Sequence, residues 1–178
     1  GSFGLRNILH YRAMDHFFLL DVDGTNRLSG NVEQDQKQRQ HGYEAQLTSF
    51  NDGPFNWVAG IFSFWESNDQ PTRGDIFTTG STFYVSQDTT AYAIYAQGSY
   101  ELSDKLTLVF GGRYSRENKD FNVRAVRPNG VEAFTKAMDE TWSRPDWKLL
   151  LDYDFSDDVM GYVSATTGFK SGGYNGRV

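Results

Sequence analysis

Few residues of this chain have the types and spacing that catalysis or metal binding needs. Two pairs of adjacent carboxylates, Asp139-Glu140 and Asp157-Asp158, lie in a polar stretch and in a turn signal, where we expect them to be solvated. The histidines His10, His16 and His41 do not recur at i and i+4, a spacing that brings two imidazoles onto one metal. No serine elbow or histidine-based triad can be assembled. We therefore expect no catalytic residue, no enzymatic activity and no metal site.

Glycine and cysteine motifs do not supply a cofactor site either. The stretch DVDGTN at 21–26 has glycine at its fourth position, whereas an EF-hand calcium loop needs it at the sixth. The glycine pairs in FGGRY and KSGGYNG lack the spacing that cradles a phosphate. The chain has no cysteine, and its net charge of −6 disfavours a nucleic-acid partner. We expect neither a cofactor nor a nucleic acid.

The elements that carry these residues alternate apolar and polar side chains with a period of two, which predicts β-strands. No run approaches the roughly 20 apolar residues of a membrane-spanning helix. We predict seven strands: about 3–14, 41–49, 55–66, the two strands of a hairpin around 103–105, about 141–155 and about 159–170. Tight turns are predicted at 51–54, 103–105 and 156–158. The polar stretches 21–40, 67–88 and 117–140 are interpreted as loops.

Short turns and long connections alternate along the chain, which indicates a meander with its tight turns all at one end. The long connections are interpreted as loops of about 16–24 residues, which are uncommon in a compact soluble domain. Transmembrane β-barrels have this asymmetry, with short periplasmic turns and longer extracellular loops. The predicted fold class is therefore all-β, an antiparallel up-and-down meander that forms part of a transmembrane β-barrel.

One face of the predicted strands carries no charge, as a surface in contact with hydrocarbon requires. Charged residues such as Glu101, Arg113, Lys148 and Asp152 fall on the opposite face. Between 55 and 66 both faces are apolar, so the pattern leaves the direction of these side chains open. A soluble β-sandwich also alternates, but its strands average about 5–6 residues. The uncharged face comprises Tyr92, Ile94, Ala96, Gly98, Tyr100, Leu102, Leu106, Leu108, Phe110, Gly112, Tyr114, Trp147, Leu149, Leu151, Tyr153, Phe155, Val159, Gly161, Val163, Ala165 and Phe169.

The hairpin around 103–105 also predicts a register. Leu102 and Leu106 share a face, so paired residues have numbers that sum to 208. Tyr95 then lies opposite Arg113, and Gln97 lies opposite Gly111. With a rise of about 3.3 Å per residue and a tilt near 45°, Arg113 is expected about 20 Å above the turn, close to the extracellular mouth.

Three stretches resemble the barrel of TonB-dependent outer-membrane receptors: NWVAGIFSFWES, TAYAIYAQGSYELSDKLTLVFGGRYSRENKDF and LDYDFSDDVMGYVSATTGFKSGGYN. The resemblance implies a gram-negative outer-membrane transporter with a barrel of about 22 strands around a plug domain. Residues 1–178 contain no plug and no TonB-binding segment, and seven strands do not close a barrel. We therefore expect the chain to be a barrel segment of a longer receptor.

The resemblance also implies a function and partners. Such receptors import iron–siderophore complexes and other scarce nutrients, energised by TonB and its inner-membrane complex, in a membrane that contains lipopolysaccharide. A passive porin-like channel and a non-transport barrel, an adhesin or an assembly factor, are the alternatives. Because a guanidinium suits anionic ligands, we expect Tyr95, Gln97 and Arg113 to line the ligand path. In the alternative interpretation, Arg113 only pairs with an acidic residue of the lumen or plug.

Overall fold

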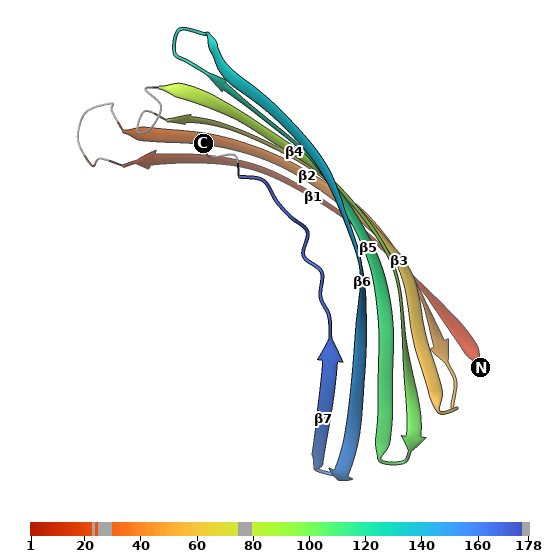
Figure 1. The fold of residues 1–178 in the computed structure, drawn as a ribbon. Coiled ribbons are helices and arrows are strands. Elements are labelled where there is room, and N and C mark those ends of the chain that lie inside the picture. Colours follow the sequence, from red (N-terminus) through yellow and green to blue (C-terminus); the bar gives the residue numbers. More distant parts are fainter. Residues whose placement is uncertain (23, 25–29, 75–79, 176–178) are drawn as a thin grey trace.

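The computed structural model describes residues 1–22, 24, 30–74 and 80–175, and these form one seven-stranded antiparallel sheet (Figure 1). Strands follow one another in space in the order of the sequence, so each strand pairs with its neighbours along the chain. No helix in this part of the chain is long and apolar enough to cross a membrane. The strands are β1 (Ser2–Asp21), β2 (Asn31–Phe50), β3 (Phe55–Gly74), β4 (Ser81–Ser103), β5 (Leu106–Val126), β6 (Glu132–Ser156) and β7 (Val159–Thr166).

This order confirms the predicted fold class and meander. The three tight turns, after β2, β4 and β6, lie at the same end of the sheet, the lower end in Figure 1. The predicted register of the central hairpin is also confirmed away from the turn, with Tyr95 opposite Arg113 and Gln97 opposite Gly111. At the turn the register shifts, so Leu106 pairs with Ser103 and not with Leu102.

The prediction of long loops at the other end is wrong. Residues 31–40, 67–74, 81–88, 117–126 and 132–140 are strand, so the strands reach 20 to 25 residues, apart from the eight of β7. Most of these segments are polar on both faces, and only 117–126 has an apolar face, formed by Phe121, Val123 and Ala125. Their backbone groups nevertheless pair across the sheet, as between Gln36 and His16. β7 is shorter than predicted and ends at Thr166.

The sheet is strongly curved, and the chain after β7 runs along its concave side (Figure 1). There Lys119 Nζ donates hydrogen bonds to Ser171 Oγ at 2.9 Å and to the Gly172 carbonyl at 2.8 Å. Odd-numbered residues of β5 therefore point to the concave side. We call this side the inner face and the convex side the outer face, and the strand register assigns every other residue to one of them.

With one exception, the uncharged residues predicted to share a face lie on the outer face, where many are exposed; Ile94 is 61% exposed. The exception is Phe169, which follows the end of β7 and does not belong to the sheet. Register also decides the direction of residues 55–66. Ile61 pairs with Ile94, so Phe55, Trp57 and Ile61 point outward. Together these residues form an apolar outer band beside the tight turns.

Aromatic rings mark the edge of this band away from the tight turns. His41 stacks on Trp65 with ring centroids 5.2 Å apart, and Tyr92 meets the Trp65 ring edge-on at 5.7 Å. Aromatic residues are typical of both edges of the lipid-facing band of a transmembrane β-barrel. We call His41, Trp65 and Tyr92 the aromatic belt.

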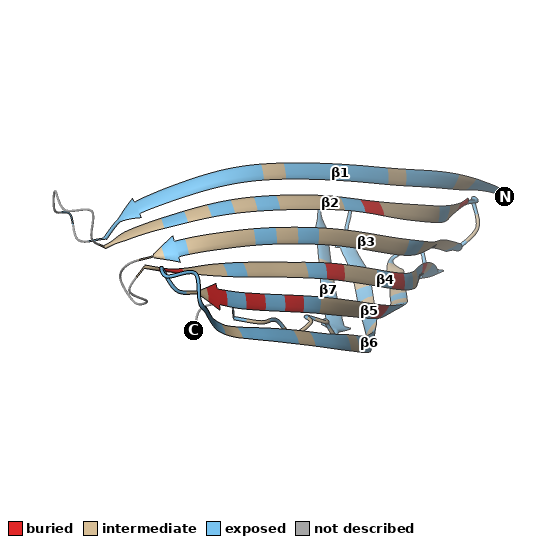
Figure 2. Cartoon of the chain, turned by 90° about the horizontal axis from the view of Figure 1, so that it is seen from above, coloured by how far each residue is buried: buried red, intermediate tan, exposed pale blue. Residues whose placement is uncertain are grey.

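Burial is limited, and most buried residues belong to β4 and β5 (Figure 2). The largest of them are on the inner face of β5. Phe121, Val123 and Ala125 are almost completely buried there, whereas no large side chain of the described residues is less than 2% exposed. The described residues thus bury few apolar side chains against one another. The outer band remains open to another apolar environment.

Candidate ligand-lining site on the inner face

Tyr95 of β4 reaches across a neighbouring strand to a carboxylate. Its Oη donates a hydrogen bond to Glu44 Oε1 of β2 at 2.5 Å, and Gln46 Nε2 donates to the same oxygen at 3.0 Å. The ring crosses β3 at Gly60, where an added Cβ would stand 2.5 Å from the Tyr95 oxygen. The absence of a side chain at position 60 is therefore what lets β2 and β4 make this contact.

Arg113 of β5 lies beside this tyrosine. Its guanidinium carbon is 5.9 Å from the Tyr95 ring centroid and 5.5 Å from that of Phe62, within the range of cation–π contact. Its Nε donates to Ser115 Oγ at 2.9 Å. None of the described residues places a carboxylate within ion-pair distance of Arg113. Aromatic faces hold the guanidinium in position without neutralising it.

The third predicted residue, Gln97, shares a cavity of about 390 Å³ with Tyr95 and Arg113. Gln97 packs on Gly111, where an added Cβ would be 3.2 Å from the Gln97 Cβ. The structure therefore brings all three predicted residues to one cavity. That they line a ligand path stays a prediction.

Three charged side chains of this cavity, and the segment that forms one of its sides, were not predicted from the sequence. Glu44, Asp146 and Lys148 also line it, and the end of β7 with the residues that follow it, 166–168, forms one side. Asp146 pairs in register with Arg113, yet its buried Oδ1 has no hydrogen-bond partner among the described residues. Extending the hairpin register to β6, where paired numbers sum to 259, would have found Asp146.

The predicted height of Arg113 needs correction. Arg113 is seven residues from the start of β5 and thirteen from its end, because the strand continues to Val126. The side chain therefore lies in the lower middle of the inner wall, well below the far strand ends. The polar stretch after Arg113 is strand rather than loop, which is why the estimate placed it close to the mouth.

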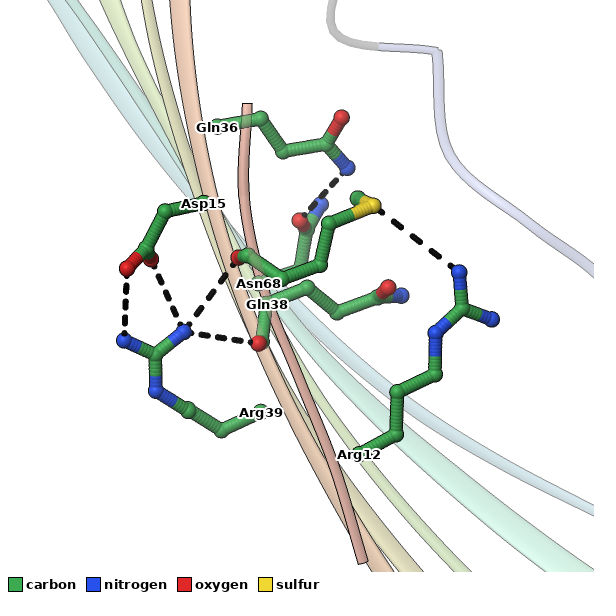
Figure 3. Close-up of polar contacts among 7 residues, drawn as sticks. Arg12, Asp15, Gln36, Gln38, Arg39 and Asn68 are labelled. Atoms are coloured by element: carbon green, nitrogen blue, oxygen red, sulfur yellow. Dashed lines mark hydrogen bonds and ion pairs between the residues drawn. The ribbon is translucent and has the colours of Figure 1, made fainter. Parts of the chain in front are cut away.

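Farther from the tight turns, β1 and β2 carry an ion pair on the outer face, whereas the inner face of β2 and β3 carries mainly amides (Figure 3). On the outer face, the Arg39 guanidinium bonds both carboxylate oxygens of Asp15, at 2.9 and 3.3 Å, and this hydrogen bonding holds the pKa of Asp15 below its usual value. On the inner face, Gln36 donates to Asn68 at 2.9 Å. Gln38 and Gln40 both donate to Glu66. The upper inner wall of β2 and β3 is thus mostly amide, with one carboxylate.

An antiparallel meander with an apolar convex band, an aromatic edge and a polar concave face is the wall of an outer-membrane type of β-barrel. Residues 1–177 match the family model for the TonB dependent receptor-like β-barrel. The chain belongs to this family of outer-membrane β-barrel receptors.

Two solved structures share the fold at low sequence identity. The ferric yersiniabactin uptake receptor FyuA from Yersinia pestis is 17% identical with a TM-score of 0.72, and the match covers 90% of this chain and 24% of that one. The ferric-catecholate import receptor Fiu from E. coli K12, in its open form, is 14% identical with a TM-score of 0.59, covering 92% and 32%. This chain therefore spans about a quarter to a third of their length. No curated protein sequence matches it. These matches are to receptors, in line with the expectation that the protein is not an enzyme.

Proposed function

We propose that this chain forms part of the wall of a gram-negative outer-membrane receptor that imports a scarce nutrient such as an iron–siderophore complex. Family membership supports the receptor class. FyuA and Fiu are named for ferric ligands, which makes a ferric chelate the first candidate. The iron is cargo here, and no resident cofactor is proposed.

The observation that carries the proposal is that Arg113 faces the inner cavity without an ion pair among the described residues. Arg113 is exposed on the inner wall, where its Nε donates to Ser115 Oγ. None of the described residues places a carboxylate within ion-pair distance of its guanidinium, although Glu44 and Asp146 line the same cavity. The planar donor groups of Arg113 suit carboxylate, catecholate or phosphate oxygens. Tyr95 and Gln97 add a ring face and an amide to the same cavity. The cavity also holds Lys148 and the carboxylates of Glu44 and Asp146, so we propose that an anionic chelate binds at its two cations, Arg113 and Lys148.

The proposal includes partners outside residues 1–178. We propose that a plug domain fills the lumen and that TonB, with its inner-membrane complex, supplies the energy for import. A passive porin-like channel would need neither. Energy dependence therefore separates the two functions more directly than any feature of the wall.

Growth of a strain that lacks the full-length receptor tests the proposal. In iron-limited medium, the parent strain should grow on at least one member of a panel of hydroxamate, catecholate and citrate chelates of iron, and the deletion strain should not. Deleting TonB should abolish the same growth. Growth that survives TonB deletion would favour a passive channel, and equal growth of parent and deletion strain on every chelate would contradict iron import.

A further inference from the structure

The chain leaves the sheet after β7 at a point that the sequence of β6 determines. The Thr167 N–H donates to the Trp147 carbonyl at 2.9 Å, and the Trp147 N–H donates to Thr167 Oγ1 at 3.0 Å. Pro145 occupies the next position of β6 whose N–H would face β7, because alternate residues of a strand face the same neighbour. Proline has no N–H and is found where a strand lacks a neighbour on that side. Pairing between β6 and β7 therefore ends here.

Residues 167–175 then run along the concave side of the sheet, and we call them the strap (Figure 1). Polar groups of β5 hold the strap near its middle. Lys119 bonds Ser171 and the Gly172 carbonyl, and Ser171 Oγ donates to Glu117 Oε1 at 2.6 Å. Lys119 and Glu117 form an ion pair at 3.1 Å, and their side chains are only 16% and 23% exposed. These contacts meet at Ser171.

Aromatic rings of the wall complete the attachment of the strap. The centroid of the Tyr174 ring lies 5.2 Å from that of Phe121 and 6.2 Å from that of Trp142. Gly172 lies against the indole of Trp142, where an added Cβ would be 2.6 Å from the ring. At Gly173 an added Cβ would have no described atom within 4 Å. Close contact with the wall thus requires glycine at 172 and not at 173.

Side chains, and not a backbone ladder, hold the strap on the wall. No backbone–backbone hydrogen bond joins residues 168–174 to the described part of the sheet. Segments with few such bonds have low local stability, and moving elements are drawn from them. A small set of contacts at Lys119, Trp142 and Phe121 therefore decides whether the strap is attached.

The base of the strap, residues 167 and 168, forms part of one side of the cavity that Arg113 lines. A molecule that needs this space binds better when the strap has moved, and such a difference in affinity shifts a conformational equilibrium. We propose that the strap is a gate held closed by Lys119, which opens when the Arg113 cavity is occupied. Its base moves first, and Lys119 and Tyr174 then lose their contacts. The inference rests on the proposed function, because the occupant is the imported chelate.

Spin-label distances in the full-length receptor test the attachment without any nutrient. Nitroxides are placed at Lys170→Cys on the strap and at Lys136→Cys on β6, both exposed positions. Lys119→Met should add a second, longer distance, because losing hydrogen bonds from a charged group shifts the ratio of closed to open strap by a factor of about ten or more. Gly172→Ala should do the same, whereas its neighbour Gly173→Ala should keep the wild-type distance. An unchanged distance in both Lys119→Met and Gly172→Ala would overturn the inference.

The same labels report on the occupied receptor. Ferric citrate, a ferric trihydroxamate and a ferric triscatecholate are added in turn, and binding is measured in parallel. A chelate that binds should produce the longer distance in the receptor with a wild-type strap. Binding without any change of distance would overturn the gate.

A reversible lock tests whether import requires the strap to move. The chain has no cysteine, so Glu117→Cys and Ser171→Cys can be joined by a short bis-thiosulfonate linker that a reductant cleaves. The locked receptor should lose import of the radiolabelled chelate and regain it on cleavage. The control linker joins Val109→Cys to Leu150→Cys, which pair on β5 and β6, and it should have no effect.

Equal import by the locked and the cleaved receptor would overturn the gate. A receptor that imports none of the three chelates, with or without the linker, would contradict the proposed function instead. In that case the distances in Lys119→Met and Gly172→Ala still decide whether the strap is held as inferred.

Discussion

Position 60 needs glycine because the Tyr95 side chain lies against it, and not because its own backbone conformation excludes other residues. The Tyr95 ring occupies the space that a side chain there would need, because its oxygen and its Cζ would stand 2.5 Å and 2.6 Å from an added Cβ. The backbone carbonyl oxygen of Ala45 would also be only 2.8 Å from the added Cβ, so both the Tyr95 ring and the β2 backbone occupy this space. Any side chain at position 60 must therefore break the contact between Tyr95 and Glu44.

We predict that Gly60→Ala lowers the heat stability of the full-length receptor. The loss should be about 1.5–3 kcal/mol, because a hydrogen bond to a charged group is broken. Thermal unfolding in detergent measures the effect, and Gly112→Ala is the control, since its Cβ would meet its nearest atom at an ordinary 3.7 Å. In a Tyr95→Phe background the Gly60→Ala effect should shrink. Full additivity of the two changes would mean that Gly60 acts in another way.

Arg113→Ala should show whether Arg113 contributes to ligand uptake or to the stability of the barrel. Arg113 has no ion pair among the described residues, so we expect nearly unchanged heat stability and at least tenfold weaker uptake of the chelate that supports growth. Arg113→Lys should recover only part of the uptake, because lysine lacks the planar donor fork. Unchanged uptake together with reduced heat stability would leave Arg113 a structural role only.

At the scale of the strand, the outer band should not tolerate charge. Leu108 and Leu149 both lie on the outer face within this band, and Leu108 is the closer of the two to the tight turn. Leu108→Arg or Leu149→Arg should cost about 2–4 kcal/mol in hydrocarbon and reduce the amount of receptor in the outer membrane. Thr107→Arg, on the inner face of β5, should be milder. Equal surface yields for the two faces, measured by labelling of intact cells, would contradict this assignment.

The polar halves of the strands give a second prediction at this scale. Residues 82–91 of β4 and 117–126 of β5 are paired in a continuous antiparallel ladder. Their amides should therefore exchange with deuterium much more slowly than those of the turn residues 127–131. Hydrogen exchange by mass spectrometry on the receptor in micelles measures this. If these amides exchange as fast as those of the turn, the stretches are loops, as the sequence predicted, and not strands.

At the scale of the whole molecule, the isolated chain lacks what would cover its surfaces. Two edges of the sheet are open: the edge strand β1, and the part of β6 that β7 does not pair with. Large apolar side chains are also exposed on the outer face, such as Leu9 at 78%. Open edges and apolar patches promote association. We predict that residues 1–178 alone associate in detergent-free buffer, as measured by analytical ultracentrifugation. A monodisperse monomer with a cooperative melting transition would contradict the barrel assignment.

The sequence by itself determined the parts of this protein that local alternation encodes. Period-two patterning predicted the number of strands and the parts of them near the tight turns, and turn residues predicted the turns. The alternation on either side of the hairpin turn predicted the register that places Tyr95 opposite Arg113. These follow from the sequence because side-chain direction and turn geometry depend on neighbours along the chain.

Only the tertiary structure decided what depends on partners across the sheet. The polar stretches are strands because backbone hydrogen bonding needs a neighbouring strand and not an apolar side chain. Both faces of residues 55–66 are apolar, so their own pattern does not decide the direction of Ile61. Its pairing with the outward-pointing Ile94 decides it. Asp146 likewise appears beside Arg113 only once β6 is in register. The physical reason is that pairing is between strands, and one strand's pattern does not specify which residues its neighbour places beside it.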